Sequence, residues 1–264
     1  MDPETAGSGK DRENKFAAFL RRRDIFRKGA ACMTEAEHRE ILQRELDKQR
    51  MMYENVIATI TKGMATVIES RDNSTGEHVI RTGRVVELFM EKLQKDPAFH
   101  MSESWARCVT YAAPLHDLGK IAVPDSILCK PARFSPEEFD HMKHHALVGA
   151  RINFEIFSEL SNTELIRVLT NIAHYHHEKW NGEGYPKGLK GTQIPLEARI
   201  MALADVFDAL VSKRCYKESM PYDQAFEIME KLNGVHFDPE LGKKFLEMRE
   251  ELISLYEGFR ENPE

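Results

Sequence analysis

The run YAAPLHDLGKI (residues 111–121) places His116 and Asp117 side by side, and HHEKWNGEGYP (residues 176–186) opens on the adjacent pair His176 and His177. A further carboxylate, Asp205, lies in ALADVFDAL (residues 202–210). Imidazole and carboxylate ligands without any thiolate suit a hydrolytic or redox-capable metal centre, with iron or manganese favoured over a structural zinc site. These runs therefore predict a metallohydrolase.

The segments around these runs show helical periodicity and almost no strand-like alternation. Ser135-Pro136-Glu137-Glu138 is typical of a capping box with Pro at the first helical position, so a helix should start there and run toward Phe157. Other helices are predicted over residues 81–93, 102–116, 162–177 and 196–212, and the last two helices are predicted to begin at Pro221 and Pro239. The predicted fold class is all-α.

One segment cannot be helical. Residues 181–195 contain four glycines and two prolines and directly follow the adjacent histidine pair. Such a loop suits either the rim of a ligand pocket or a plain surface crossover.

The N-terminal part of the chain divides into two predicted regions. Residues 1–33 mix glycine and charge without periodicity, which indicates a poorly ordered lead. Residues 34–70 predict a long amphipathic helix, because apolar side chains recur at steps of three, four and seven, at Leu42, Leu46, Tyr53, Val56, Ile60, Met64 and Val67. Such a helix either pairs with its twin in a homodimer or lies on its own domain, and we favour the homodimer.

Composition limits the classes of function. The chain has 264 residues and a formal net charge of -6, which argues against a long nucleic acid as partner, since duplex binding relies on many Lys and Arg contacts. No apolar run approaches the roughly 20 residues that span a bilayer. The four cysteines have no paired spacing and are predicted to be free thiols, so we expect a cytoplasmic protein.

From about Val67 to Glu250 the chain resembles the HD-GYP domains of the HD phosphohydrolase superfamily. The resemblance rests on five runs in the same order: STGEHVIRTGRV (74–85), YAAPLHDLGKI (111–121), HALVGA (145–150), HHEKWNGEGYP (176–186) and ALADVFDALVSKRCYK (202–217). The triplet Gly184-Tyr185-Pro186 is intact. The resemblance implies that an HD-type helical bundle follows the long helix in the sequence, with the catalytic domain over residues 71–256.

The resemblance also implies a set of metal ligands. One ion would be held by His78, His116, Asp117 and Asp205, and the second by Asp117, His145, His176 and His177. Asp117 would bridge the two. Some relatives bind a third ion through a Glu four residues before the first histidine, but Ser74 stands there and Glu77 should point elsewhere on its helix, so we expect two divalent ions. Iron or manganese is favoured, with nickel or zinc as alternatives.

The resemblance also implies catalytic or substrate-binding roles for four further residues. Lys120 would stabilise charge on the scissile phosphate, and Arg214 and Lys217 would contact the phosphates of the substrate. Tyr185 would face the substrate. Relatives often carry Asp where this chain has Asn181; Asn keeps the turn-forming side chain and drops the charge, so the loop should keep its shape.

These residues together predict a two-metal phosphodiesterase that hydrolyses cyclic di-GMP to linear pGpG, and onward to GMP, through a metal-bridging hydroxide. The alternatives are a hydrolase of cyclic GMP-AMP and a non-catalytic module that binds a cyclic dinucleotide or a partner. The long helix suggests an upstream sensory domain or a GGDEF-type signalling partner.

Other polar residues are expected to support the fold. Asp208, one helical step after Asp205, is expected to stabilise the helix or support a ligand, and His174 is expected to face away from the site. The remaining histidines are expected on the surface or in packing: His38, His100, His141, His144 and His236.

Overall fold

A computed structural model describes residues 34–71, 77–212 and 219–261 of the chain. Within these ranges the regular structure is helical and contains no β-strand, which confirms the all-α prediction. The elements follow in the order α2 (Glu35–Glu69), α3 (Glu77–Lys95), α4 (Glu103–Ala112), η1 (Ala113–Leu115), η2 (Leu118–Ala122), α5 (Asp125–Leu128), α6 (Pro136–Phe157), α7 (Thr163–Tyr175), η3 (Gly191–Gln193), α8 (Leu196–Val211), α9 (Tyr222–Leu232), α10 (Pro239–Leu246) and α11 (Arg249–Glu261).

The chain divides into two compact units, Met1–Val56 and Ile57–Glu264. The division falls inside α2, which is one continuous helix within a residue of the predicted bounds. Residues 1–33, predicted as a poorly ordered lead, lie outside the described residues. The three-part division into residues 1–33, 34–70 and 71–256 stays a prediction.

Helix α2 begins with a reciprocal cap at its N-terminus. The amide of Glu37 donates to Thr34 Oγ1 at 3.3 Å, and the amide of Thr34 donates to Glu37 Oε2 at 2.8 Å. Most of the apolar stripe predicted for this helix is exposed on the single chain: Leu42, Leu46, Tyr53, Val56, Ile60 and Val67. An exposed stripe of this kind indicates that α2 has apolar surface still to cover.

The core of the second unit is built where apolar faces of distant helices meet. The ring of Phe245 (α10) lies 5.3 Å from that of Phe89 (α3) and 5.6 Å from that of Phe207 (α8). All three side chains are at most 1% exposed. Each such burial stabilises the fold by about 1.5–3 kcal/mol, so these contacts fix α3, α8 and α10 against one another.

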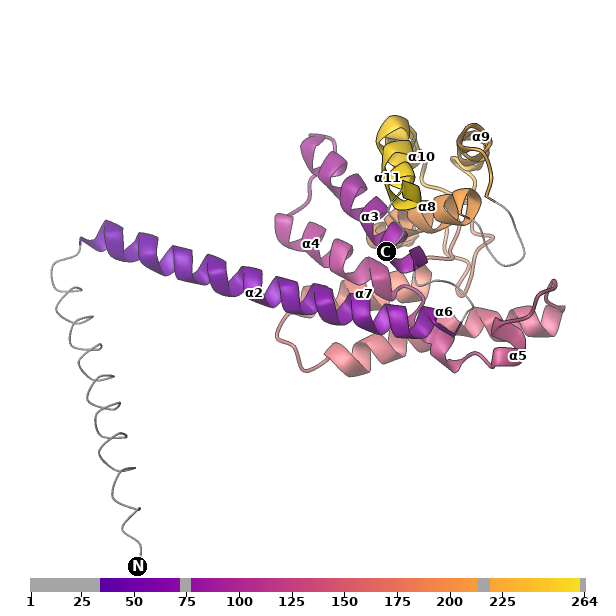
Figure 1. The fold of residues 1–264 in the computed structure, drawn as a ribbon, viewed down its shortest axis with the longest axis horizontal. Helices are drawn as coiled ribbons and strands as arrows, with labels where there is room; N and C mark the ends of the chain where they lie inside the picture. The colour runs from indigo at the N-terminus through magenta and orange to yellow at the C-terminus, as the bar shows by residue number, and fades with distance from the viewer. Residues whose placement is uncertain (1–33, 72–76, 213–218, 262–264) are drawn as a thin grey trace, which may run out of the picture. The chain divides into compact units, whose positions relative to one another are not determined.

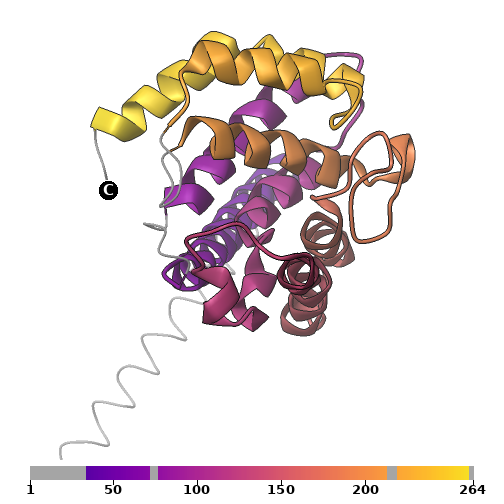
Figure 2. The ribbon, with the colours of Figure 1, turned by 90° about the vertical axis from the view of Figure 1, so that its right-hand side faces the viewer.

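Helix α8 is the central element of this unit. It packs against α3, α7, α9 and α10, while α6 packs against α7 and η2. Figures 1 and 2 show α8 between the layer of α9, α10 and α11 and the pair α6 and α7. Because α8 is apolar on almost all sides, a carboxylate on it needs a partner inside the protein.

Local signals placed most helix starts correctly. Ser135 forms the predicted capping box with Glu138, and Asn162 caps α7. The prediction that one helix runs from residue 102 to His116 was wrong: α4 ends at Ala112, and η1, which contains Pro114, follows. Proline has no amide hydrogen to donate, so Pro114 cannot continue the hydrogen bonding of α4. The helices at Pro221 and Pro239 are not the last two, because α11 follows them.

Two further predictions concern the chain as a whole. In the described ranges, no helix combines the length and the apolar character needed to cross a membrane. Cys108 and Cys129 are free thiols, as predicted, whereas Cys32 and Cys215 lie outside the described residues.

Candidate metal centre

Both adjacent pairs lie where a helix ends. His116 closes η1 and Asp117 lies between η1 and η2, with φ −99° and ψ 11°. His176 is the C-cap of α7, and His177 follows it. Neighbouring side chains in a regular α-helix point about 100° apart, and a break in the helix allows both members of a pair to face one place.

Three residues from distant elements form what we call the first cluster. It comprises His78 of α3, His116 and Asp205 of α8, whose ligand atoms all lie within 4.8 Å of one another. His78 Nε2 lies 3.3 Å from His116 Nε2 and 3.6 Å from Asp205 Oδ1. The packing of α3 on α8 therefore brings together residues that are far apart in the sequence.

Four residues form the second cluster beside it. Its members are Asp117, His145 of α6, His176 and His177, and their ligand atoms also lie within 4.8 Å of one another. Asp117 Oδ1 is 3.3 Å from His145 Nε2 and 3.7 Å from His176 Nε2.

The two oxygens of Asp117 face different clusters. While Oδ1 faces the second cluster, Oδ2 lies 3.3 Å from His116 Nε2 of the first cluster and 2.9 Å from Lys120 Nζ. The Asp117 carboxylate therefore lies between the two clusters, with one oxygen facing each of them.

Hydrogen bonds on the far side of the rings fix the histidine tautomers. The Nδ1 atoms of His116, His145 and His176 face main-chain carbonyls at 2.8, 2.6 and 2.9 Å, those of Ala113, Met142 and Ile172. A carbonyl oxygen only accepts, so each Nδ1 carries the proton and donates it. The Nε2 lone pairs are left pointing into the clusters, as histidine metal ligands require.

His78 is held in the same way by a side chain. Its Nδ1 lies 2.7 Å from Oδ2 of Asp208, which is fully buried on α8. The other oxygen of Asp208 accepts from Arg81 Nε at 2.6 Å and from the hydroxyls of Ser212 and Tyr256 at 3.0 and 2.9 Å. Burial opposes ionisation, but His78 and Arg81 outweigh it and hold the pKa of Asp208 below its ordinary value. Asp208 thus supports a cluster residue, as expected.

The clusters leave buried polar atoms unpaired. Asp117 Oδ1, His145 Nε2 and His176 Nε2 are buried and accept no hydrogen bond within the described part of the chain. The facing Nε2 atoms of His78 and His116 also need a cation between them, either a proton on one ring or a metal ion. Each buried unpaired group costs about 1–3 kcal/mol. The atoms left open, all nitrogen and oxygen, fit a divalent metal ion in either cluster.

Burial and charge set the protonation of these groups. Burial opposes ionisation of Asp117, but Lys120 and His116 outweigh it and hold the pKa of that carboxyl well below its ordinary value. Burial would lower the pKa of His116, but Asp117 and Asp205 raise it to about 9. Burial is the main reason that the pKa of His145 falls to about 4 and that of His177 lies well below its ordinary value. Ionised carboxylates and neutral imidazoles are the metal-binding forms, and a metal ion has to displace the proton of His116.

The glycine-rich loop is tied to the second cluster by Glu178, a residue whose role the sequence did not indicate. This side chain is 2% exposed, and its two oxygens accept the amides of Lys187 at 2.7 Å and Leu189 at 3.0 Å. Gly184 packs so closely that a Cβ there would collide with the main chain of Glu178. The loop is therefore held on the residue that follows His177.

This loop brings Tyr185 to the centre. The Tyr185 amide donates to the carbonyl of His177 at 3.2 Å, and the two rings lie 4.7 Å apart. Burial, with Asp117 and Asp205 nearby, raises the pKa of the Tyr185 hydroxyl, so it stays protonated at neutral pH.

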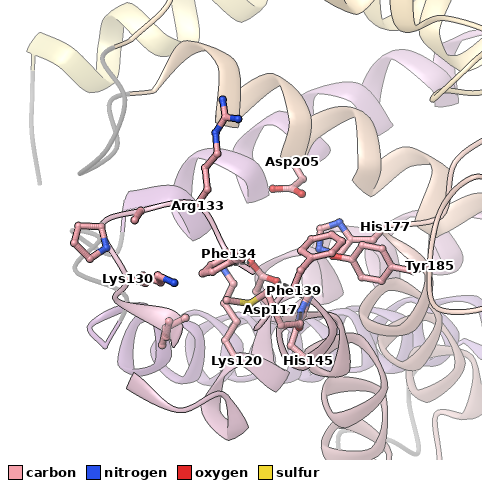
Figure 3. A pocket seen from close by; sticks show the side chains of 14 residues that line it. Asp117, Lys120, Lys130, Arg133, Phe134, Phe139, His145, His177, Tyr185 and Asp205 are labelled. Carbon is pink, nitrogen blue, oxygen red and sulfur yellow. Dashed lines mark hydrogen bonds and ion pairs between the residues drawn. The ribbon is translucent and has the colours of Figure 1, made fainter. Parts of the chain in front are cut away.

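A cavity of about 720 Å³ opens above the clusters (Figure 3). In Figure 3, Asp117, Lys120 and His145 lie at its base, while Asp205 and His177 line it higher up, with Tyr185 beside His177. The segment Lys130–Phe134 lines another side, and Phe139, which meets Tyr185 edge-on, also lines the cavity. The cavity has the size of a small-molecule site and places charged groups at its base.

The seven predicted ligands are thus brought together, and Lys120 and Tyr185 line the same cavity. Arg214, Lys217 and Ser74 lie outside the described residues. Glu77 belongs to neither cluster and pairs with Arg81 at 2.9 Å, as the prediction that it points elsewhere requires. Exposed histidines agree with the surface assignment: His38, His100, His141 and His144.

Two other histidines are less exposed than a surface position implies. His174 is 8% exposed and belongs to neither cluster. His236 is partly buried and stacks on Phe237, which agrees with a packing role. Burial, together with Lys179, lowers the pKa of His236 to about 4.

Comparison with known proteins gives the family. The model of a family described as "HD domain" matches residues 63–241. The chain belongs to the HD domain family. With His116-Asp117 and the intact Gly184-Tyr185-Pro186, it is an HD-GYP member, as the five sequence runs predict.

Similar proteins carry phosphodiesterase names. A "probable cyclic di-GMP phosphodiesterase" of Vibrio cholerae serotype O1 is 42% identical over 224 residues, which cover 83% of this chain and 49% of the relative. A "3′3′-cGAMP-specific phosphodiesterase 2" of the same organism is 41% identical over 192 residues, which cover 73% of this chain and 35% of the relative. The chain thus spans half or less of the length of these curated relatives.

A solved structure supports the fold. An HD-GYP-type protein of Bdellovibrio bacteriovorus matches with a TM-score of 0.52 and 18% identity, over 74% of this chain and 71% of that one. At this identity the likeness concerns the fold, which is the predicted HD-type helical fold.

Proposed function

We propose that this HD-GYP chain is a metal-dependent phosphodiesterase of cyclic dinucleotides, with cyclic di-GMP as its substrate. One observation carries the proposal: two ligand clusters that meet at Asp117 both contribute lining residues to a cavity that is also lined by Lys120. The names of the similar proteins support the same chemistry.

Two divalent ions would be held by the first cluster and the second cluster, with Asp117 binding both. When bound, such ions polarise a phosphoryl oxygen and lower the pKa of a water molecule, which makes a nucleophile available near neutral pH. Iron or manganese is our favoured metal, and nickel or zinc can use the same nitrogen and oxygen ligands.

Lys120 would act on the phosphate itself. Its ammonium group, 2.9 Å from Asp117 Oδ2, lies at the base of the cavity, where it can stabilise negative charge on the phosphoryl oxygens in the transition state. The neutral Tyr185 hydroxyl faces the same space as a hydrogen-bond donor. Arg214 and Lys217 keep their assignment as phosphate contacts on the sequence resemblance.

Cleavage of one phosphodiester would give linear pGpG, and cleavage of the second would give GMP. A hydrolase of cyclic GMP-AMP is the second candidate, because a relative named as specific for that substrate is 41% identical. Rates on the two substrates, measured side by side, decide between them.

The test uses the full chain purified without air and loaded with iron or manganese. We expect hydrolysis of cyclic di-GMP, and no turnover by His116→Ala. The matched control is His100→Ala, which changes an exposed histidine away from both clusters and should keep the activity. A loaded protein that leaves both cyclic dinucleotides uncut over hours would refute the proposal.

A non-catalytic binding module is the remaining alternative. Degenerate modules lose ligands, and both clusters here are complete. Fewer than one metal ion per chain after anaerobic purification would favour the binding module.

We also propose that α2 pairs with α2 of a second copy. Four side chains at seven-residue spacing are all at least 50% exposed on the single chain: Leu46, Tyr53, Ile60 and Val67. Leu46→Glu combined with Ile60→Glu should convert a dimer to a monomer in sedimentation, whereas Lys48→Glu should not. An upstream sensory domain or a GGDEF-type partner would act through this helix, and the greater length of the relatives leaves room for such a domain.

A further inference from the structure

One wall of the cavity carries groups that the proposed chemistry does not use. The segment Lys130–Phe134 supplies Arg133 and Phe134, and α6 supplies Phe139 (Figure 3). Phe134 is 36% exposed and Phe139 is 45% exposed. Exposed aromatic rings beside a charged cavity are a sign of ligand binding, because their exposure to water is unfavourable and they do not contribute to the hydrophobic core.

The wall formed by the segment Lys130–Phe134 is held in place by Glu138 of α6. Glu138 binds Lys130 Nζ at 2.6 Å and accepts the Ser135 amide at 2.7 Å, so one carboxylate holds both ends of the segment. Ser135 in turn caps α6. Arg133 and Phe134 lie between these two anchored positions. The segment is therefore held in place before a ligand binds, and binding should cost little conformational entropy.

The two rings differ in what they already contact. Phe139 meets Tyr185 edge-on at 6.1 Å, and Lys143 Nζ lies 5.2 Å from its ring centre. Phe134 contacts no other aromatic ring in the part of the chain that the structure describes. With 36% of its surface exposed, Phe134 has ring surface that a flat partner can reach.

Arg133 differs in the same way from the other cations of the cavity. Lys120 pairs with Asp117 and Lys130 with Glu138. Within residues 34–71, 77–212 and 219–261, Arg133 has no ion-pair partner. A guanidinium fork of this kind matches the two free oxygens of a phosphodiester.

We propose that Phe134 stacks on one purine base of the cyclic dinucleotide and that Arg133 binds the phosphodiester that is not being cut. A cyclic dinucleotide has two bases and two phosphates, so with one phosphate at Asp117 and Lys120 the other half has to lie along a wall. The wall offers Arg133 for the second phosphate and Phe134 for one of the two bases. This inference rests on the proposed function.

The stacking half is tested by Phe134→Leu, which keeps an apolar side chain and removes the ring. The matched control is Phe154→Leu, because Phe154 is 55% exposed on α6 and does not line the cavity. Loss of base stacking should raise KM for cyclic di-GMP about tenfold, with kcat within about twofold. Phe134→Trp should restore KM. Equal KM values for Phe134→Leu and Phe154→Leu would overturn the stacking role.

The phosphate half is tested by Arg133→Gln against Arg151→Gln, an exposed arginine on the same helix as Phe154. KM for cyclic di-GMP should rise about tenfold in Arg133→Gln only. Inhibition by inorganic phosphate, which needs only the base of the cavity, should be unchanged in both. A matching loss of phosphate inhibition would assign Arg133 to the cleaved phosphate and overturn this half.

A binding measurement separates this inference from the proposed function. In calorimetry, Phe134→Leu should weaken binding of GMP about tenfold and leave ribose 5-phosphate, which has no base, unaffected. This result without any hydrolysis of cyclic dinucleotides would refute the proposed function and keep the stacking subsite. If cyclic dinucleotides are hydrolysed but Phe134→Leu and Phe154→Leu bind GMP equally well, the proposed function stands and the stacking subsite is refuted.

Discussion

The first cluster and the second cluster use the same kinds of ligand but are held by different means. In the second cluster, His145 and His176 are oriented by carbonyls three and four residues earlier on their own helices. In the first cluster, His116 is oriented in the same local way by Ala113, but His78 is oriented by Asp208, 130 residues away on α8. The second cluster therefore depends mainly on local helix geometry, and the first depends in addition on the tertiary packing of α3 on α8. Two neighbouring sites can thus differ in what breaks them.

Asp117→Asn should have the largest effect, because the Asp117 side chain faces both clusters. The amide keeps the shape, removes the charge and replaces one of the two oxygens with a donor nitrogen, so the side chain can no longer bind a cation at both clusters. We expect kcat to fall at least about a thousandfold, and bound metal to fall below one ion per chain by elemental analysis. A variant that keeps two ions would show that the clusters are independent of Asp117.

Asp208→Asn should damage the first cluster alone. The change leaves Arg81 buried without its full charge partner, which should cost about 3 kcal/mol of stability. Loss of a residue that supports a ligand typically weakens metal binding about 10- to 100-fold. Metal titration should then show one tight ion and one weak ion per chain.

Ser212→Ala, which removes one hydroxyl from Asp208 and leaves Arg81 and His78 in place, is the milder control for this variant. It should keep two tight ions. Equal weakening of both sites in Asp208→Asn would contradict the division into two separately held clusters.

Gly119→Ala should damage the second cluster. Gly119 of η2 lies against the main chain of α6, and a Cβ there would collide with the carbonyl oxygen of His145 and the amide of Gly149. The strain should lower the free energy of unfolding by about 1–3 kcal/mol, measured by denaturant unfolding, and move Asp117 away from His145. The matched control is Gly63→Ala, where a Cβ meets nothing within 4 Å.

Asn181→Asp should have the smallest effect. The side-chain Oδ1 of Asn181 accepts a hydrogen bond from the main-chain amide of Glu183 at 2.9 Å, and a carboxylate can keep that bond. The side-chain amide also donates to Glu183 at 2.8 Å, and the variant replaces this contact with repulsion in an exposed place. Activity should stay within about twofold and stability within about 0.5 kcal/mol. A larger change would show that the loop affects the second cluster through more than Glu178.

Sequence patterns predicted the parts of the molecule that depend on neighbouring residues. The capping box at Ser135, the cap at Asn162 and the bounds of α2 are local, and so is the turn at Asn181. Helix 102–116 was extended too far because the apolar periodicity continued past Pro114, and that proline was the signal for the break.

The supporting contacts of the site could not be predicted in the same way. Glu178 follows two histidines and looks like an ordinary surface charge, yet its partners are amides 9 and 11 residues later. The four contacts of Asp208 come from α3, from residue 212 and from α11. No local pattern encodes contacts that exist only once the helices have packed.

The anchoring of Lys130 and Ser135 on one carboxylate has a practical consequence for engineering. Positions 131 to 134 lie between two fixed points and outside the hydrophobic core, so their side chains can be exchanged without disturbing the ligand clusters below. If the proposed function holds, a library confined to these four positions would alter which dinucleotide fits and leave the two ligand clusters unchanged. Glu138 and its partner Lys130 would be the residues of this region to leave unchanged.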